Sequence, residues 1–417
     1  MRAMAMRSIP IRSIPIQRLQ IADRHLGRLA LVLLQPWRWL RSSMRGAGGS
    51  QPRRVLLIKF WGIGSLQLLT PAVQALRVAH PKARLELLTL AENADFATGL
   101  GIFDEVLRLD AGCSSWIQIF RRILRLVSEL RDRSYGVVYD FEFFTRFSAV
   151  VSFLTGASRS VGFSTASVWR GGLHTAGVTF NRYWHVARNF RALAGGENGR
   201  ELSSEEITAY QPDAQDRAVV AEHLGESGAV IVLNINAGRL SLERRWPMDN
   251  FVGLAQRLLG ETEASLVFVG AASEAAYVAE AVKALGDEDP RVLNLAGKLS
   301  IGQLVALLDN AALVVTNDSG PMHLAATLGT PTVGLFGPET PQMYAPLGAR
   351  ATALYRPTIC SPCINVHENK VATCIHGRPE CLVNLSVDEV LERSLTEFRG
   401  RSALLMFPGS ENLRHDA

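Results

Sequence analysis

The sequence predicts an α/β protein made of two similar domains that face each other across a cleft. Short apolar runs alternate with helical segments over residues 54–163, which predicts a parallel sheet with helices on both faces. The same alternation returns over residues 229–337. Small polar and glycine-rich loops follow the predicted strands, and ligands of such sheets lie beyond the carboxyl ends of the strands.

Composition supports a globular protein with a separate basic arm. The chain has 417 residues, of which 47% are hydrophobic and 20% charged. Residues 1–54 contain 11 arginines, no lysine and one acid, Asp23, so the net +5 of the chain is concentrated there. We expect no transmembrane helix, because no run of about 20 apolar residues occurs. We also expect no secretory signal, because the apolar patch Leu29–Leu34 is short and no small-residue cleavage site follows it.

We expect four segments in chain order: a basic arm over 1–50, an N-terminal domain over 51–225, a C-terminal domain over 226–385, and a last helix and tail over 386–417, the tail being loose from Gly400. In the arm, RSIPI occurs twice within residues 7–16, where two prolines prevent a regular helix. Residues 21–40 predict an amphipathic helix rich in Leu, Arg and Trp, which suits either peripheral membrane contact through residues 1–45 or packing on the protein's own body. RNA binding is disfavoured, because no basic and aromatic module follows, and we expect no nucleic-acid partner.

The first domain has four predicted strands with helices between them. The strands are Val55–Lys59, Arg84–Thr89, Glu105–Leu109 and Val137–Phe141, and the helices are Leu66–Ala79, Trp116–Arg131 and Phe147–Leu154. Residues 164–226 are mixed. There His174, His185 and Arg188 are either structural or line the acceptor side, and Asp213–Leu224 predicts a helix.

The second domain repeats the pattern. Its predicted strands are Val230–Asn236, Ser265–Val269, Val292–Leu295, Leu313–Val315 and Thr332–Phe336. Its predicted helices are Pro247–Leu259, Ser273–Leu285, Ser300–Leu308, Met322–Leu328 and, last, Ser386–Phe398. Ser300 and Gln303 have the spacing of a capping box at the start of a helix.

The most informative stretch is Leu313–Gly337, a strand, a polar loop and a helix start. Free backbone N–H groups and the positive end of a helix dipole favour an anion there. Ser319 can add a hydroxyl, Gly320 permits close approach of a ligand, Pro321 suits the first position of the helix and His323 is one turn in. This pattern predicts a diphosphate-binding turn, against the alternative of an ordinary βαβ turn.

Residues 317–338, NDSGPMHLAATLGTPTVGLFGP, resemble the C-terminal signature of the heptosyltransferases, glycosyltransferase family 9. Residues 70–89, TPAVQALRVAHPKARLELLT, resemble the segment after that family's first loop, and the whole resemblance covers about residues 54–395. It implies a GT-B fold and a metal-independent, inverting glycosyltransferase that requires no cofactor. It further implies a nucleotide-diphosphate donor, ADP-heptose by default, and a lipopolysaccharide core or other bacterial glycan as acceptor. Such an enzyme is expected in the cytoplasm, peripheral on the inner membrane.

The donor residues implied by the resemblance lie at strand ends of the second domain. Arg244 and Arg245 resemble the family's basic-x-Trp-Pro motif and would neutralise diphosphate charge. Gly270 and Glu274 resemble a Gly-x-x-x-Glu loop whose glutamate binds ribose. The complete donor set is Asn236, Gly238, Arg244, Arg245, Gly270, Glu274, Asn317, Asp318, Ser319, Gly320, Pro321, Met322 and His323, with Asp318 also expected to touch the donor sugar.

The first loop departs from the family pattern. Gly62 and Gly64 fit, but Ser65 stands where the family usually has the aspartate proposed as the base, and a serine hydroxyl cannot accept that proton unaided. Substitute bases are Glu142, which we favour, and Asp140; the alternatives are a solvated loop residue and a structural cap. Arg146 is expected on the acceptor side. Ser65 also leaves open a non-catalytic protein that binds nucleotide sugar and acts in envelope glycan assembly. A dinucleotide oxidoreductase is disfavoured, because the third glycine of its motif is missing.

Cys360, Cys363, Cys374 and Cys381 have spacing that suits a closed zinc site, with His367 and His376 as substitute ligands. Reduced thiols and disulfides are the alternatives, and we expect any such metal in segment 360–381 to be structural.

Overall fold

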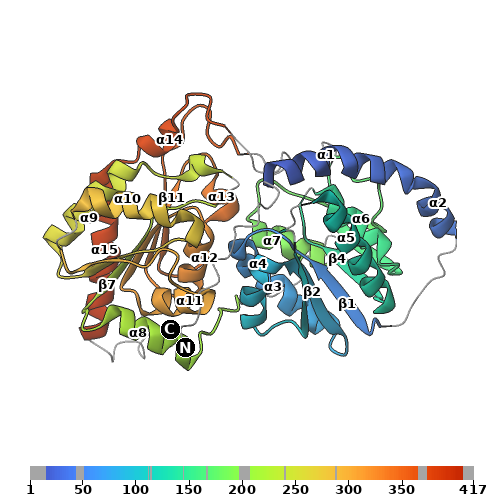
Figure 1. Ribbon diagram of the computed structural model, residues 1–417, viewed down its shortest axis with the longest axis horizontal. Coiled ribbons are helices and arrows are strands. Elements are labelled where there is room, and N and C mark those ends of the chain that lie inside the picture. Colours follow the sequence, from blue (N-terminus) through green and yellow to red (C-terminus); the bar gives the residue numbers. More distant parts are fainter. Residues whose placement is uncertain are drawn as a thin grey trace, which may run out of the picture.

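The computed structural model describes residues 16–43, 51–110, 112, 115–143, 145–165, 168–196, 207–238, 241–286, 289–364 and 373–406. The RSIPI repeats up to residue 15, His367 and the chain after residue 406 lie outside this part. Within it, two parallel α/β halves lie side by side (Figure 1).

The first half contains a six-stranded parallel sheet of order β3-β2-β1-β4-β5-β6. Its strands are β1 Arg54–Ile58, β2 Arg84–Leu90, β3 Glu105–Leu109, β4 Val137–Asp140, β5 Arg159–Ser164 and β6 Ala176–Thr179. Its helices are α3 Ile63–Ala79, α4 Ala91–Gly99, α5 Trp116–Asp132, α6 Arg146–Leu154 and α7 Val186–Ala194. The central strand β1 is apolar and buried over Val55–Ile58, as expected for a strand covered by helices on both faces.

The second half contains a six-stranded parallel sheet of order β12-β11-β10-β7-β8-β9. Its strands are β7 Val230–Asn234, β8 Ser265–Phe268, β9 Val292–Asn294, β10 Leu313–Asn317, β11 Thr332–Phe336 and β12 Ala351–Tyr355. Its helices are α8 Ala214–Leu224, α9 Met248–Glu261, α10 Ala275–Leu285, α11 Ile301–Asn310, α12 Gly320–Thr327, α13 Pro341–Tyr344, α14 Glu380–Val383 and α15 Val387–Met406, with 3₁₀ turns at Leu242–Arg244 and Ala272–Glu274.

Every predicted strand and helix is present, and several boundaries are corrected. The helix expected over residues 21–40 is two helices, α1 Ile16–Leu33 and α2 Gln35–Ser43, with Pro36 at the start of the second. The helix α12 begins at Gly320, so Pro321 is its second residue. The last helix runs to Met406, so the expectation of a loose tail from Gly400 is wrong as far as Met406. The proposed domain boundaries stay predictions.

The two halves meet through α3 and α12, and α4 also contacts α11 (Figure 1). A Cβ atom built on Gly64 would lie 3.2 Å from Gly320 Cα, and one on Gly320 would lie 2.6 Å from Ile63 Cγ1. The starts of α3 and α12 therefore lie so close that a side chain at Gly64 or Gly320 would clash with the opposite helix, and glycine is needed at both positions. In the described part of the chain, no helix is long and apolar enough to cross a membrane.

Candidate active site

The predicted anion-binding turn connects β10 to α12 and is held by side chains of neighbouring strands. Asp318 N donates to Leu335 O at 3.0 Å, which ties the turn to β11. Asn234 Nδ2 donates to Ser319 Oγ at 2.8 Å, so the hydroxyl is anchored to β7. The helix start that follows offers the positive end of its dipole to the space above the sheet.

Arg244 lies at this same turn. Its Nη1 donates to Asp318 O at 3.0 Å and to Asp318 Oδ2 at 3.2 Å, and the side chain is mostly buried. The structure thus brings Arg244 to Asp318 and the start of α12, which lie about 75 residues further along the chain. A guanidinium beside a helix N-terminus is an arrangement that binds phosphate oxygens.

Asn317 and Asn236 connect the strand ends beneath the turn. Trp246 N donates to Asn317 Oδ1 at 2.9 Å, and Asn317 Nδ2 donates to Asn236 O at 3.2 Å. Asn236 Nδ2 donates to Val269 O at 3.0 Å. These bonds join the ends of β7, β8 and β10, so both asparagines hold the loops in place. Their role as donor ligands stays a prediction.

Arg245 and Glu274 lie beside the end of β8. The Arg245 guanidinium carbon lies 4.1 Å from the Tyr277 ring centroid, and its Nη2 lies 3.9 Å from Glu274 Oε1. Glu274 Oε2 accepts from Ala271 N at 2.9 Å, which closes the short turn before α10. Position 270 requires a glycine because the site is closely packed: a Cβ atom built there would lie 2.6 Å from Asn236 Nδ2. Gly238 has ordinary room, with Arg244 Nη2 at 3.5 Å from a built Cβ.

His323 and Met322 are on the first turn of α12, and both are buried. A Cβ atom on Gly64 would lie 2.7 Å from His323 Cδ2, so the imidazole packs directly against the first loop of the other half. In this structure the space beside Gly64 and Gly320 is filled by the opposite half. A ligand approaching Gly320 would therefore have to share or widen this contact.

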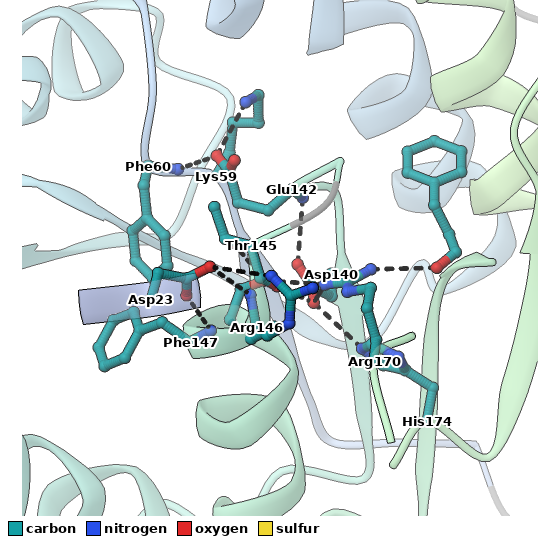
Figure 2. A network of polar contacts seen from close by, with 12 residues as sticks. Asp23, Lys59, Phe60, Asp140, Glu142, Thr145, Arg146, Phe147, Arg170 and His174 are labelled. Carbon is teal, nitrogen blue, oxygen red and sulfur yellow. Dashed lines mark hydrogen bonds and ion pairs between the residues drawn. The ribbon is translucent and has the colours of Figure 1, made fainter. Parts of the chain in front are cut away.

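Glu142 fastens the first loop of the N-terminal half (Figure 2). Its Oε1 accepts from Lys59 Nζ at 2.8 Å, Phe60 N at 2.6 Å and Trp61 N at 3.1 Å. Glu142 is 2% exposed and Lys59 is 1% exposed, so the alternative of a solvated loop residue is wrong. Ser65, half-buried, lies a few residues further along the same loop and helix start.

Asp140, at the end of β4 and two residues before Glu142, is enclosed in a second network of polar side chains (Figure 2). Its Oδ2 accepts from Arg170 Nη2, from Ser148 Oγ at 2.9 Å and lies 3.1 Å from His174 Nε2. Its Oδ1 accepts from Glu142 N at 3.1 Å. Burial alone would raise the pKa of Asp140, but Arg170 and the hydrogen bonds outweigh it and hold the pKa below its ordinary value. This network matches the structural alternative for Asp140 better than a catalytic base.

Arg146, expected on the acceptor side, is directed toward the arm. Its side chain is buried and its Nη1 lies 3.9 Å from Asp23 Oδ2. Asp23 also accepts from the backbone N of Arg146 at 3.1 Å and of Phe147 at 2.7 Å, so it caps α6 from another helix (Figure 2).

Tyr344 and Glu339 are site residues that sequence reasoning missed. Glu339 follows the end of β11 and Tyr344 is the last residue of α13, and both side chains are buried. Burial raises the pKa of the Tyr344 hydroxyl well above its ordinary value, and the charges of Glu339, Asp318 and Glu142 raise it further. The Gly-Pro-Glu sequence after the strand was the available signal.

His185 connects the two halves. Ala187 N donates to its Nδ1 at 3.3 Å, which caps α7, and its Nε2 lies 3.1 Å from Ala345 O. Since Nδ1 accepts, the ring proton is on Nε2 and is donated to Ala345 O. Burial lowers the pKa of His185, which keeps this neutral form. The structural role foreseen for this histidine is thus the one observed.

The four cysteines of segment 360–381 gather around one small pocket, together with His376 and Glu380. All four are free thiols. Burial and the neighbouring Cys363 raise the pKa of Cys381 to about 11. Among the described residues, no group of three or more His, Cys, Asp or Glu side chains has a geometry that could hold a metal ion. The observed arrangement does not fit a closed zinc site, and no chemical step is assigned to a metal.

Two parallel α/β halves that meet at their strand-end loops are the GT-B class of fold. The structure of E. coli ADP-heptose lps heptosyltransferase II shares it, with a TM-score of 0.68 and 21% identity over 84% of this chain and 99% of that one. Residues 123–374, more than half of the chain, match glycosyltransferase family 9 (heptosyltransferase). The chain belongs to this family, which confirms both the predicted fold and the predicted class of enzyme.

Two curated relatives agree with this assignment. Lipooligosaccharide heptosyltransferase 2 of Haemophilus influenzae is 38% identical over 113 residues, 27% of this chain and 32% of the relative. Lipopolysaccharide heptosyltransferase 2 of Escherichia coli (strain K12) is 32% identical over 150 residues, 36% of this chain and 41% of the relative. The matched part thus spans 32% of the length of the first relative and 41% of the length of the second.

Proposed function

We propose that the protein is an inverting glycosyltransferase that moves a sugar, heptose by default, from a nucleotide-diphosphate donor to a lipopolysaccharide core or another bacterial surface glycan. Family membership and the names of the relatives support this substrate class. The observation that carries the proposal is the meeting of Arg244 and the start of α12 at one turn that faces Gly64 of the other half.

The donor side of the proposal is electrostatic. Arg244 and the N-terminus of α12 stabilise the negative charge that grows on the diphosphate as the bond to the sugar breaks, and Ser319 and His323 flank that position. Arg245 and Glu274, beside Tyr277, lie where a ribose would follow the diphosphate. Asp318, already oriented by Arg244, would touch the donor sugar.

The reaction itself needs a base. A carboxylate takes the proton of the acceptor hydroxyl, the hydroxyl oxygen attacks the anomeric carbon from the side opposite the diphosphate, and the nucleoside diphosphate leaves with the bonding electron pair. We assign the base to Glu142 in preference to Asp140. The Oε2 atom of Glu142 takes part in none of the three bonds that fix Oε1, which leaves that oxygen to accept a proton.

A transfer assay tests the proposal. The full chain is given a panel of nucleotide sugars, ADP-heptose first, with heptose-deficient lipopolysaccharide as acceptor, and donor binding is measured by calorimetry. We expect turnover with one donor. Absence of both binding and turnover across the panel would refute the proposed donor class.

Two matched variants locate the base. Glu142→Gln keeps the shape and the acceptor oxygen for Lys59 but cannot take a proton, so transfer should fall about 10²- to 10⁴-fold. Lys59→Met breaks the same ion pair while keeping the carboxylate. If both variants lose activity equally and melt equally early, Glu142 acts by holding the first loop and the base is elsewhere.

A non-catalytic protein is the second candidate, and Ser65 is the observation that favours it. Such a protein would bind a nucleotide sugar at the α12 turn and serve in envelope glycan assembly. Donor binding without turnover, even with lipid-linked acceptors present, would support it. Restoring an aspartate by Ser65→Asp should then create measurable transfer.

A lipid-anchored acceptor also requires work at a membrane surface, and we propose the cytoplasmic face of the inner membrane. No cofactor enters the proposed reaction. A structural zinc ion at the four cysteines is testable by elemental analysis of protein purified without chelators. One zinc per chain, lost in Cys381→Ser, would establish that site despite the geometry described above.

A further inference from the structure

The arm helices are attached to the first half by one face only. Leu31 is fully buried against Phe153 and Leu173, and Gln35 Nε2 donates to Gly171 O at 3.1 Å. Asp23 caps α6, as described above. Figure 1 shows α1 lying across the first half above α6, with α2 continuing outward. These contacts fix which side of the arm faces away from the protein.

The outward side of the arm is apolar. Its large exposed side chains include Leu26, Leu29, Leu33, Trp37, Trp39 and Leu40, with Trp39 74% exposed. Helices of a soluble body rarely expose so many large apolar groups on one continuous face. Leucines with tryptophans near the end of the pair are typical of a helix that lies in the headgroup region of a bilayer.

The exposed charges of the arm are positive. Arg24 and Arg28 are exposed beside the apolar side chains. The single acid of residues 1–54, Asp23, is turned inward and bonded to the start of α6. No carboxylate of the arm is therefore available to repel an anionic surface, while its arginines attract one.

We propose that the outward face of α1 and α2, the arm face, is a docking surface for an anionic lipid bilayer. A second copy of the chain fits it less well, because a symmetric contact would bring the arginines of both arms together. A nucleic acid would use the arginines but would leave the leucines in water.

The position of the arm face indicates how an acceptor would reach the site. This part of the inference rests on the proposed function. Asp23 holds the first residues of α6, four residues after Glu142 in the chain. The docked bilayer would therefore lie next to the side of the cleft that receives the acceptor. A lipid-anchored sugar could then reach the site without leaving the membrane.

Vesicle co-flotation of the full chain tests the docking alone, without turnover, so its failure is distinguishable from failure of the proposed function. The vesicles contain phosphatidylethanolamine with about one quarter phosphatidylglycerol, and phosphatidylcholine vesicles serve as the neutral comparison. We expect binding to the anionic vesicles that weakens in high salt. Arg24→Gln with Arg28→Gln should weaken it about fivefold for each arginine, and Leu29→Ser with Leu33→Ser and Trp37→Ser should weaken it more than about tenfold.

The helix α5 supplies a matched control, because Phe120 and Leu124 are also exposed apolar residues on the same half. The variant Phe120→Ser with Leu124→Ser should bind like the wild type. Unchanged binding by the arm variants, with melting temperatures preserved, would overturn the proposal. So would equal binding to neutral and anionic vesicles, tighter binding of a single-stranded RNA, or a dimer that disappears in the leucine variant.

Discussion

Asp140 illustrates how a carboxylate at a strand end can be structural. Its charge is matched by Arg170 and by hydrogen bonds from Ser148 and His174 in a site without solvent. Replacing it leaves the Arg170 charge buried without its partner. We expect Asp140→Asn to lower the free energy of unfolding by about 3–5 kcal/mol, measured by urea denaturation.

The surface pair of Asp289 and Arg291 is the comparison for this prediction. Its atoms are 2.8 Å apart, but both side chains are about a third exposed. Asp289→Asn should therefore cost no more than about 1 kcal/mol. A similar loss in both variants would mean that burial does not set the strength of the Asp140 network. Because the pKa of Asp140 is lowered by folding, its contribution is present above its ordinary pKa and is lost as pH falls through the folded value.

His185 gives a second pH prediction. The folded protein keeps it neutral with a lowered pKa, while the unfolded chain takes up a proton near pH 6.5. The unfolded state therefore binds more protons below that pH, and stability should decrease as pH falls, by at most about 1.4 kcal/mol per unit from this residue. Unfolding measured between pH 7.5 and pH 5 should show a shallower decrease in His185→Gln. The decrease should not vanish, because the pKa values of His80 and His174 are also lowered.

The arm and α6 are coupled by a capping bond between separate elements. Asp23→Ala removes the acceptor for two N–H groups at the start of α6, so we expect a loss of about 1 kcal/mol and faster amide hydrogen exchange in both α1 and the first turn of α6. Asp213 caps α8 within its own segment, with Asp216 N donating to it at 2.7 Å. Asp213→Ala should cost a similar amount but leave exchange in α1 unchanged. Slow exchange in α1 after Asp23→Ala would show that the contacts of Leu31 and Gln35 hold the arm without the capping bond.

Among the secondary-structure elements, the central strands of each sheet could be predicted from the sequence, and several strands nearer the sheet edges could not. The strands β1, β4, β7 and β10 are continuous apolar runs buried on both faces, which is a strong local signal. The strands β5, β6 and β12, toward one side of each sheet, contain glycine, alanine, serine or threonine between their apolar residues and gain their pairing from neighbours. Their propensity alone does not predict a strand.

The candidate site divides in the same way. The α12 turn was found because its parts are adjacent in the chain and each has a local meaning. The partners of Glu142 and Asp140 depend on contacts between distant segments. For that reason the sequence supplied Glu142 as the favoured base, with a solvated loop residue as the alternative, but did not predict its bonds to Lys59 and the first loop.

At the scale of the whole molecule, we expect a single substitution to disturb the contact between the two halves. Gly320→Ala would place a methyl group 2.6 Å from Ile63 Cγ1, so the two helix starts must move apart. We expect a loss of about 1–3 kcal/mol in stability and reduced donor binding. Adding Ile63→Ala should recover part of both.

Gly260, near the end of α9, has nothing within 4 Å of a built Cβ and is the neutral comparison. Gly260→Ala should be neutral or stabilise by up to about 1 kcal/mol. If Gly320→Ala behaves in the same way, the halves approach less closely in solution than they do here.

The bond from Phe147 N to Asp23 spans 124 residues of chain, and this has a consequence for synthesis. At typical ribosomal rates, roughly 6–25 s separate the appearance of Asp23 from that of Phe147. During this interval Leu31 has no folded body to cover it, and the Asp23 carboxylate has no helix to cap. The nascent chain therefore presents a basic segment with exposed leucines before α6 has been made, and translation beside a membrane would give that segment a surface to occupy in the meantime.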